Sequence, residues 1–244
     1  MKKVLIVEAS ARAQGLVEGR SGSLSRFLSD RFSSRWRHLN NEDIFIYRDV
    51  GAMPPQFMSH KWIAAAFTSE ESRSAEQRAL LCLSDQLIAE VAQADLILIA
   101  TPMYNYGMPA SLKAWFDQVI RVNKTFSFDL ARGDFPLQPL LSGKTLVLLT
   151  SSGEFGFEPG GLRESMNHLG PHVRTLSHYL GVEEFHEIGI EYQEFGDDRH
   201  RASIDLARQA VDELVEQLSR GPVHLHADVF FTPGEASAAL AGKP

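Results

Sequence analysis

Residues 96–120 read LILIATPMYNYGMPASLKAWFDQVI, and this stretch decides the fold. Its opening run, Leu96 to Ala100, is apolar without a break, which is typical of a strand buried on both faces of a parallel sheet. Pro109 suits the first turn of a helix, where its missing N–H costs nothing. The apolar residues that then recur with helical spacing are Leu112, Trp115, Phe116, Val119 and Ile120. The stretch therefore predicts a strand, a crowded loop and a helix, and open α/β sheets bind ligands at such loops.

The loop between this strand and this helix has an unusual composition. Met103, Tyr104 and Tyr106 are large, yet they stand at a strand end, and Asn105 and Gly107 tolerate a backbone that turns its N–H groups outward. A flat, hydrogen-bonding aromatic ligand such as an isoalloxazine ring fits that description. The alternative is a loop that packs its tyrosines into a neighbouring element or a subunit interface. On spacing alone both interpretations stay open, and packing is the commoner one.

Residues 101–126, TPMYNYGMPASLKAWFDQVIRVNKTF, closely resemble the flavin loop and following helix of the FMN-dependent NADH azoreductases. These enzymes belong with the NAD(P)H:quinone oxidoreductases of flavodoxin-like fold, and the order of elements matches over residues 1–218. The resemblance implies a flavodoxin-like α/β sandwich of three layers, with a five-stranded parallel sheet in the order 2-1-3-4-5. It further implies an FMN-binding oxidoreductase domain over residues 1–220, followed by a C-terminal tail over 221–244.

Composition bounds the function. A hydrophobic content of 44% and a charged content of 23% are those of an ordinary globular chain, and 244 residues are enough for one α/β domain. The net charge of −7 argues against a nucleic-acid partner, and no window is long and apolar enough for a membrane span. The single Cys82 and the short apolar run before Glu8, which is too short for a signal peptide, favour a cytoplasmic protein. No histidine cluster with acidic partners indicates a metal site.

The amino-terminal loop contains candidates for phosphate binding. A strand over 3–9 is followed by a polar segment, and the next helix begins near Leu24, so Ser21, Gly22 and Ser23 lie at its positive amino end. Hydroxyls from Ser10, Ser21 and Ser23 complete a phosphate cradle without a lysine, although simple N-capping by one serine is the commoner explanation. By resemblance, Ser10 and residues 21–23 match the FMN-phosphate loop, which is longer here than is usual in the family.

A third loop follows the strand predicted over 144–150. Its residues are Ser151, Ser152, Gly153 and Glu154, again on the ligand edge of the sheet. The resembling family commonly has Ser-Arg-Gly-Gly here, so Ser152 and Glu154 replace an arginine and a glycine. We expect Glu154 to point to solvent or to pair with an arginine, because a carboxylate aimed at the site disfavours an anionic reduced flavin.

The remaining pattern completes an alternation of strands and helices. It predicts a strand over 43–50, a short helix within 56–70, a helix ending near Ala94 that carries Cys82 as a structural thiol, a helical stripe over 162–180 kinked near Gly170-Pro171, a strand over 185–192 and a helix over 198–219. Thr68 with Glu71 has capping-box spacing, and Gly181 is a predicted helix C-cap. Phe126 and Phe128 either line an apolar substrate slot or pack an irregular hairpin, and the sequence leaves both interpretations open.

These patterns together predict a site at the switch point between the first and third strands. The phosphate of FMN rests on Ser10 and residues 21–23, and the ring lies against Pro102 and residues 103–106, with residues 151–154 on its other flank. By resemblance, NADH or NADPH reduces the flavin, a quinone or azo compound then reoxidises it, and one shared slot gives ping-pong kinetics. Because the cofactor carries the chemistry, no catalytic side chain is named.

The resemblance also implies a homodimer with sites at the interface, for which Trp115, Phe126 and Phe128 are candidates to reach across. Two alternatives remain. One is a flavodoxin-like one-electron carrier that does not oxidise NAD(P)H. The other is a flavin-free protein that retains the fold, because fold alone does not establish function.

Overall fold

The computed structural model describes residues 1–13 and 22–220, and its centre is a five-stranded parallel sheet. The strands are β1 (Lys3–Glu8), β2 (Ile44–Asp49), β3 (Leu96–Pro102), β6 (Lys144–Ser151) and β7 (Val182–Ile190). Their order is β2-β1-β3-β6-β7, and every neighbouring pair is parallel. Counted over these core strands, this is the predicted order 2-1-3-4-5, so the predicted flavodoxin-like architecture is confirmed.

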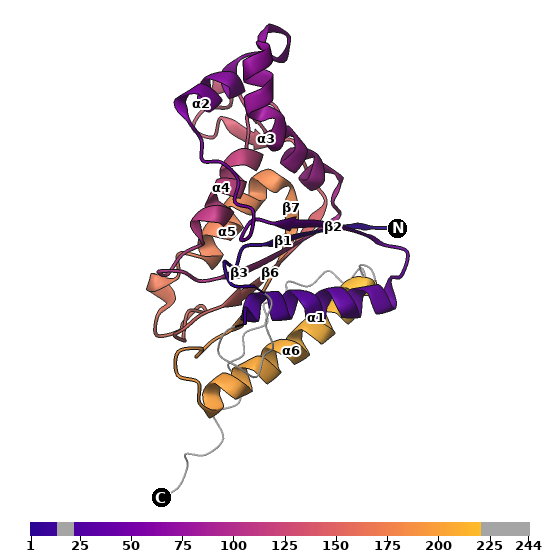
Figure 1. Cartoon of the computed structure of the whole chain (residues 1–244), viewed down its shortest axis with the longest axis vertical. Coiled ribbons are helices and arrows are strands. Elements are labelled where there is room, and N and C mark those ends of the chain that lie inside the picture. Colours follow the sequence, from indigo (N-terminus) through magenta and orange to yellow (C-terminus); the bar gives the residue numbers. More distant parts are fainter. Residues whose placement is uncertain (14–21, 221–244) are drawn as a thin grey trace, which may run out of the picture.

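Helices cover both faces of the sheet (Figure 1). One face carries α1 (Leu24–Leu39) and α6 (Asp198–Ser219), which lie side by side. The other face carries α3 (Ala75–Gln93), α4 (Ala110–Val119) and α5 (Gly170–Ser177). Successive residues of a strand point to opposite faces, so the unbroken apolar runs of β1, β3 and β6 feed two separate cores.

Helix starts follow the side chains that satisfy free N–H groups. The Oγ of Ser23 accepts a hydrogen bond from the backbone N–H of Arg26 and caps α1. The predicted capping box of Thr68 with Glu71 is wrong, because Thr68 ends α2 (His60–Phe67). The capping box is made by Ser74 and Gln77 at the start of α3. The 3₁₀ turn η1 (Glu70–Ser72) lies between α2 and α3.

The helical stripe over 162–180 is not one kinked helix. A 3₁₀ turn, η3 (Glu164–Met166), comes first, and α5 begins only at Gly170, with a proline in its first turn. Pro171 lacks the N–H that an interior helical position needs, so the sequence starts a helix there instead of bending one. A last 3₁₀ turn, η4 (His178–Leu180), ends at Gly181, whose φ of 82° confirms the predicted C-cap.

A small hairpin interrupts the chain between α4 and β6. Its antiparallel strands are β4 (Phe126–Phe128) and β5 (Leu137–Pro139), joined through the 3₁₀ turn η2 (Leu130–Arg132). The ring of Phe126 packs edge-on against Tyr179, 5.7 Å away between centroids. Tyr179 shortly precedes β7, so the hairpin lies at the amino edge of the sheet, opposite to the strand ends that the loops extend.

Two further expectations are corrected by burial. Cys82 is exposed on α3, so it is not a buried structural thiol. Trp115 has no exposed surface and packs in the core beneath α4, so it does not reach across a subunit interface. The predicted tail, 221–244, lies outside the described residues. Within residues 1–13 and 22–220, no helix is long and apolar enough to cross a membrane.

Candidate active site

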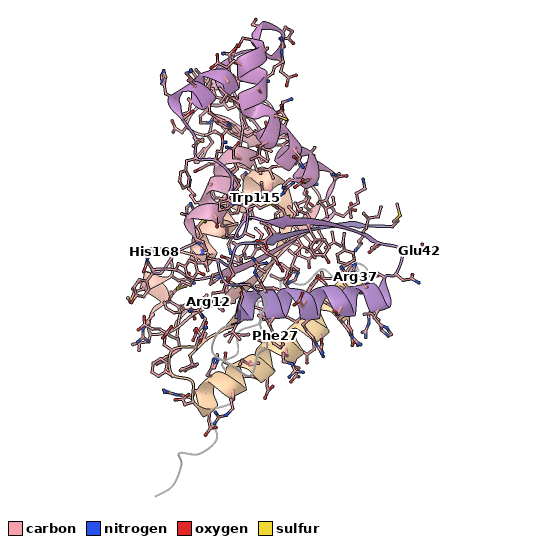
Figure 2. The ribbon with its side chains drawn as sticks, in the orientation of Figure 1. Arg12, Phe27, Arg37, Glu42, Trp115 and His168 are labelled. Carbon is pink, nitrogen blue, oxygen red and sulfur yellow. The ribbon has the colours of Figure 1, made fainter. Side chains whose placement is uncertain are left out.

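The loops after β1, β3 and β6 converge on one cavity of about 140 Å³ at the carboxyl edge of the sheet. Its wall is formed by Ser10, Arg12, Gly22, Ser23, Leu24, Pro102, Met103, Tyr104, Ser151, Gly153, Gln193 and Glu194. Figure 2 places Arg12 and His168 at this edge, whereas Glu42 lies at the opposite edge and Trp115 lies above the sheet, on the face that α3 and α4 cover. The cavity lies at the β1–β3 switch point, where chain connections leave toward opposite sides of the sheet.

The β1–α1 side of the cavity is hydroxyl-rich and well buried. Ser10 is 2% exposed, and its Oγ accepts a hydrogen bond from the N–H of Arg12 at 3.2 Å. Ser23 is 8% exposed and caps α1, so the N-capping interpretation holds for Ser23 but does not account for Ser10. Gly22 joins them in the wall, and Ser21 lies outside the described residues. Hydroxyls beside a helix amino end are suited to an anion such as a phosphate monoester.

Beneath these hydroxyls lies a charged network that sequence reasoning missed. The Arg26 guanidinium, on the buried face of α1, forms ion pairs with Glu8 and with Asp49, the latter at 2.8 Å. Burial raises the pKa of the Glu8 carboxyl. Burial also acts to raise the pKa of Asp49, but the hydrogen bonds from Arg26 and from the N–H groups of Ala52 and Gly51, together with the Arg26 charge, outweigh it and leave that pKa below its ordinary value. Arg26 shares a helix face with the buried Ser29, Ser33 and Trp36, and because two of these three are polar, no apolar pattern in the sequence marked that face as buried.

The β3 loop forms a tight turn on the other side of the cavity. Tyr104 and Gly107 exchange backbone hydrogen bonds of 2.9 and 3.0 Å, which closes a two-residue turn. Its central residues, Asn105 and Tyr106, have φ of 48° and 65°, so the predicted left-handed backbone at Asn105 is confirmed. A tyrosine at positive φ is strained, and the N–H of His168 holds it by donating to the Tyr106 carbonyl at 2.9 Å.

The β6 loop contacts the β3 loop through side chains. The Tyr106 hydroxyl donates to the Glu154 carboxylate at 3.0 Å, and this bond raises the pKa of Tyr106. The same carboxylate forms an ion pair with Arg163 at 3.1 Å, so the expectation that Glu154 points to solvent or pairs with an arginine is met by the pairing. Ser151 and Ser152 are buried, and Ser152 donates its hydroxyl to the Glu154 carbonyl. A Cβ on Gly153 would lie 2.6 Å from the Glu194 side chain, so a larger residue here requires that side chain to move.

A second, larger cavity of about 670 Å³ adjoins the first, since Met103 lines both. It lies between residues 157–171, the end of β7 and α6. Glu191 borders it and accepts hydrogen bonds from the N–H groups of Gly156 and Phe157. Burial nevertheless raises the pKa of Glu191. Neither Phe126 nor Phe128 lines either cavity, as the position of their hairpin at the other edge requires.

The donor set fits FMN. Buried hydroxyls and a helix amino end suit its phosphate, and Met103, Tyr104 and the turn at Asn105 give the ring an apolar wall beside backbone polar groups. Within the described part of the chain, no three His, Cys, Asp or Glu side chains lie together as metal ligands. Hydroxyls, a helix amino end and an apolar wall are groups suited to binding and orienting a cofactor that carries its own chemistry.

Comparison with known proteins agrees with this geometry. The model of the flavodoxin-like fold family matches residues 2–215. FMN-dependent NADH:quinone oxidoreductase 2 of Colwellia psychrerythraea is 59% identical over 218 residues, which are 89% of this chain and 100% of the relative. The chain belongs to this family of flavodoxin-like FMN-dependent NADH:quinone oxidoreductases. A further member, FMN-dependent NAD(P)H:quinone oxidoreductase 1 of Pseudomonas aeruginosa, is 38% identical over 86% of this chain and 96% of its own.

Solved structures show the same fold at much lower identity. The azoreductase from Bacillus anthracis str. Sterne superposes with a TM-score of 0.76 at 18% identity, over 89% of this chain and 100% of that one. A structure of an FMN-dependent NADH-azoreductase from Bacillus anthracis str. Ames Ancestor in complex with FMN also gives 0.76, at 16% identity over 90% and 100% of the two chains. The family's fold is therefore shared with azoreductases.

Proposed function

We propose that this chain is an FMN-dependent NADH:quinone oxidoreductase whose site is the cavity at the β1–β3 switch point. The observation that carries the proposal is the convergence of three loops on that cavity, with hydroxyls at one end and an aromatic turn at the other. Support comes from the family relationship, which extends over the full length of a relative named for this activity. FMN bound here supplies the hydride acceptor and electron donor that NADH oxidation and quinone reduction require.

Each end of the cavity has its own role in binding. The Ser10 and Ser23 hydroxyls and the amino end of α1 hold the phosphate, with Gly22 in the same wall. Residues 102–106 hold one side of the ring and residues 151–154 its other flank. No side chain of the described site is required as an acid or base, because water reaches the half-exposed Tyr104 and Tyr106. One open slot beside these tyrosines serves NADH and the acceptor in turn, which gives ping-pong kinetics.

The acceptor and the nicotinamide are assigned by class. Quinones are the primary acceptors, and azo compounds are accepted by the same slot. NADH is the expected donor, and NADPH is tested beside it because one relative is named for both nucleotides. The single cysteine of the chain supports a cytoplasmic location.

The proposed enzyme is a homodimer in which the partner closes the open side of the slot. Tyr104, Tyr106 and Met166 are 37–38% exposed beside the site, and Leu162 is 79% exposed. Phe128, 53% exposed at the amino edge, is available to reach a partner's site but not its own. Sedimentation that shows only monomer at micromolar concentration contradicts the dimer. A Phe128→Ala enzyme with unchanged KM for quinones contradicts the role of Phe128.

The test of the activity is a spectrum of the purified full-length chain after addition of FMN and gel filtration. We expect a retained flavin band that NADH bleaches and a quinone restores, with parallel initial-rate patterns when both substrates are varied. A flavodoxin-like one-electron carrier retains FMN but does not consume NADH steadily with a quinone. A colourless protein that retains no FMN rules out both assignments.

A further inference from the structure

Arg26 is a buried charge directly behind the proposed phosphate end of the cavity. It projects from the first turn of α1, and its side chain is 8% exposed. Four hydrogen bonds tie its guanidinium to the Glu8 and Asp49 carboxylates and to the carbonyls of Ser10 and Arg12. A guanidinium has five N–H donors, so little capacity remains for a ligand. Arg26 therefore acts on a ligand only through the groups that it holds.

The groups that Arg26 holds belong to the loop after β1. Its Nη2 donates to the Ser10 carbonyl at 2.9 Å, and its Nε donates to the Arg12 carbonyl at 3.1 Å. In a trans peptide the C=O and the following N–H point in opposite directions, so the N–H groups of Ala11 and Ala13 point away from Arg26. Ser10 and Arg12 also line the cavity. Arg26 thus holds the carbonyls of Ser10 and Arg12, with the N–H groups of Ala11 and Ala13 turned away from it toward a ligand, while the Arg12 N–H donates to the Ser10 Oγ.

The other contacts of Arg26 fix its position. Glu8 ends β1 and Asp49 ends β2, so the guanidinium joins two strands, one helix and the loop. Asp49 also accepts the N–H of Ala52, in the turn that brings Gly51 against the Ser10 carbonyl. Breaking one pair of a buried, fully paired network is costly because it leaves an uncompensated charge. This cost holds the network in one arrangement. A lysine, with a compact ammonium and no planar fork, cannot make the same four contacts.

We propose that Arg26 is a positioning residue that presents the peptide groups of residues 10–13 to the phosphate of FMN, and so sets the preference for FMN over riboflavin. This inference rests on the proposed function, because it assumes that FMN occupies the cavity. Riboflavin has the same ring and ribityl chain but no phosphate. A loss confined to FMN therefore separates a role in phosphate binding from a general loss of structure.

The experiment compares dissociation constants of FMN and riboflavin for the flavin-depleted full-length chain, measured by quenching of flavin fluorescence. The variants are Arg26→Gln and Arg26→Lys, and the control is Arg48→Gln. Arg48, on β2, also forms a largely buried ion pair, and its partner is Glu90 on α3. Neither residue is part of the cavity wall. We expect both Arg26 variants to weaken FMN binding by about tenfold or more, as the loss of charge-assisted hydrogen bonds requires, with riboflavin binding changed by less than about threefold.

Other outcomes overturn the inference. Equal losses for FMN and riboflavin assign Arg26 to stability alone, and an Arg26→Lys chain with wild-type preference shows that charge alone suffices. If Arg48→Gln also loses the preference for FMN over riboflavin, the effect is not specific to Arg26 and the inference is overturned. If the Arg26 variants do not fold, Asp49→Asn, at a side chain that is 34% exposed, takes their place, and an unchanged ratio of the two constants overturns the inference. Wild-type chain that binds neither flavin refutes the proposed function instead.

Discussion

The two ends of the cavity are built in opposite ways. At the proposed phosphate end, Ser10 and Ser23 are 2% and 8% exposed, and a buried guanidinium with its two carboxylates lies behind them. At the ring end, Tyr104 and Tyr106 are 37% and 38% exposed, and the ion pair of Glu154 with Arg163 lies near the surface. Buried networks are costly to break, whereas exposed pairs contribute little. We infer from the difference that FMN affinity is set at the proposed phosphate end, while the proposed ring end remains open for substrate exchange.

The largest expected effect comes from adding a side chain at Gly51, where the backbone packs tightly against the proposed phosphate end. A Cβ on Gly51 would lie 2.1 Å from the Ser10 carbonyl oxygen, so Gly51→Ala must displace the backbone that Arg26 holds. We expect a loss of about 2–3 kcal/mol in unfolding free energy. We expect FMN affinity to fall by about thirtyfold or more, since each 1.4 kcal/mol is tenfold. Denaturant unfolding and flavin fluorescence measure the two effects.

Gly107→Ala is the matched change at the ring end. Its added Cβ would meet nothing nearer than the His168 carbonyl at 4.0 Å. We therefore expect the free energy of unfolding and the free energy of FMN binding each to stay within about 1 kcal/mol of the values for the original chain. Equal losses in the two variants contradict the contrast between a rigid end and a roomy one.

A smaller effect is expected from removing a single hydroxyl. Ser10→Ala deletes the acceptor of the Arg12 N–H and the hydroxyl proposed for the phosphate, so FMN binding should weaken by about five- to tenfold. Riboflavin binding should hardly change. The control is Ser84→Ala, which removes a fully buried hydroxyl that donates to the Gln118 carbonyl far from the cavity. It should cost stability but leave FMN affinity unaltered, and equal losses of FMN affinity in the two variants exclude the phosphate role of Ser10.

A third prediction concerns the pH dependence of stability beyond the ring end. Burial raises the pKa of Glu191 in the folded chain, so folding penalises its charged form above that raised pKa. As the pH falls through the raised pKa toward the ordinary value, the carboxyl becomes neutral and the penalty disappears. Glu191→Gln should therefore raise the thermal midpoint near pH 7 by no more than about 4 °C, and the gain should vanish in the acid range.

The exposed Glu71 provides the control for that measurement. Glu71→Gln should alter the midpoint only slightly at any pH, as surface changes generally do. A Glu191→Gln chain that is less stable near neutral pH shows that the hydrogen bonds from Gly156 and Phe157 outweigh the burial of the charge.

The strands of the sheet were predictable from the sequence because parallel strands buried on both faces leave unbroken apolar runs such as Leu96 to Ala100. The order of the strands was expected from the family resemblance of residues 101–126 and not from these runs. The three loops were predictable because each follows such an apolar run. The Arg26 network was not, because its partners Glu8 and Asp49 come from two strands and meet it only when the sheet is assembled. Local signals also misled at Thr68, where capping spacing alone did not identify the residue that caps the helix.

The same limit applies to the hairpin. Phe126 and Phe128 follow the site loop closely in sequence, which suggested a place beside the ligand. The intervening α4 carries the chain to the opposite edge of the sheet, so the two phenylalanines lie far from the loop that they closely follow in sequence. Phe128 lies away from the cavity of its own chain, so the proposed substrate role of Phe128 depends on the proposed dimer.

The smallest effect is expected from Tyr106→Phe. Because its hydrogen bond to Glu154 is exposed, its loss should change FMN affinity by less than about twofold. That bond raises the pKa of Tyr106, so its stabilising contribution is fully present below about pH 10 and is lost as the pH rises through the raised pKa. The near-ultraviolet difference titration between wild-type and Tyr106→Phe should show one tyrosine that ionises late, and Glu154→Gln should bring it back toward ordinary behaviour. A loss of FMN affinity as large as that of Ser10→Ala would make the ring end an anchor and overturn the contrast between the two ends.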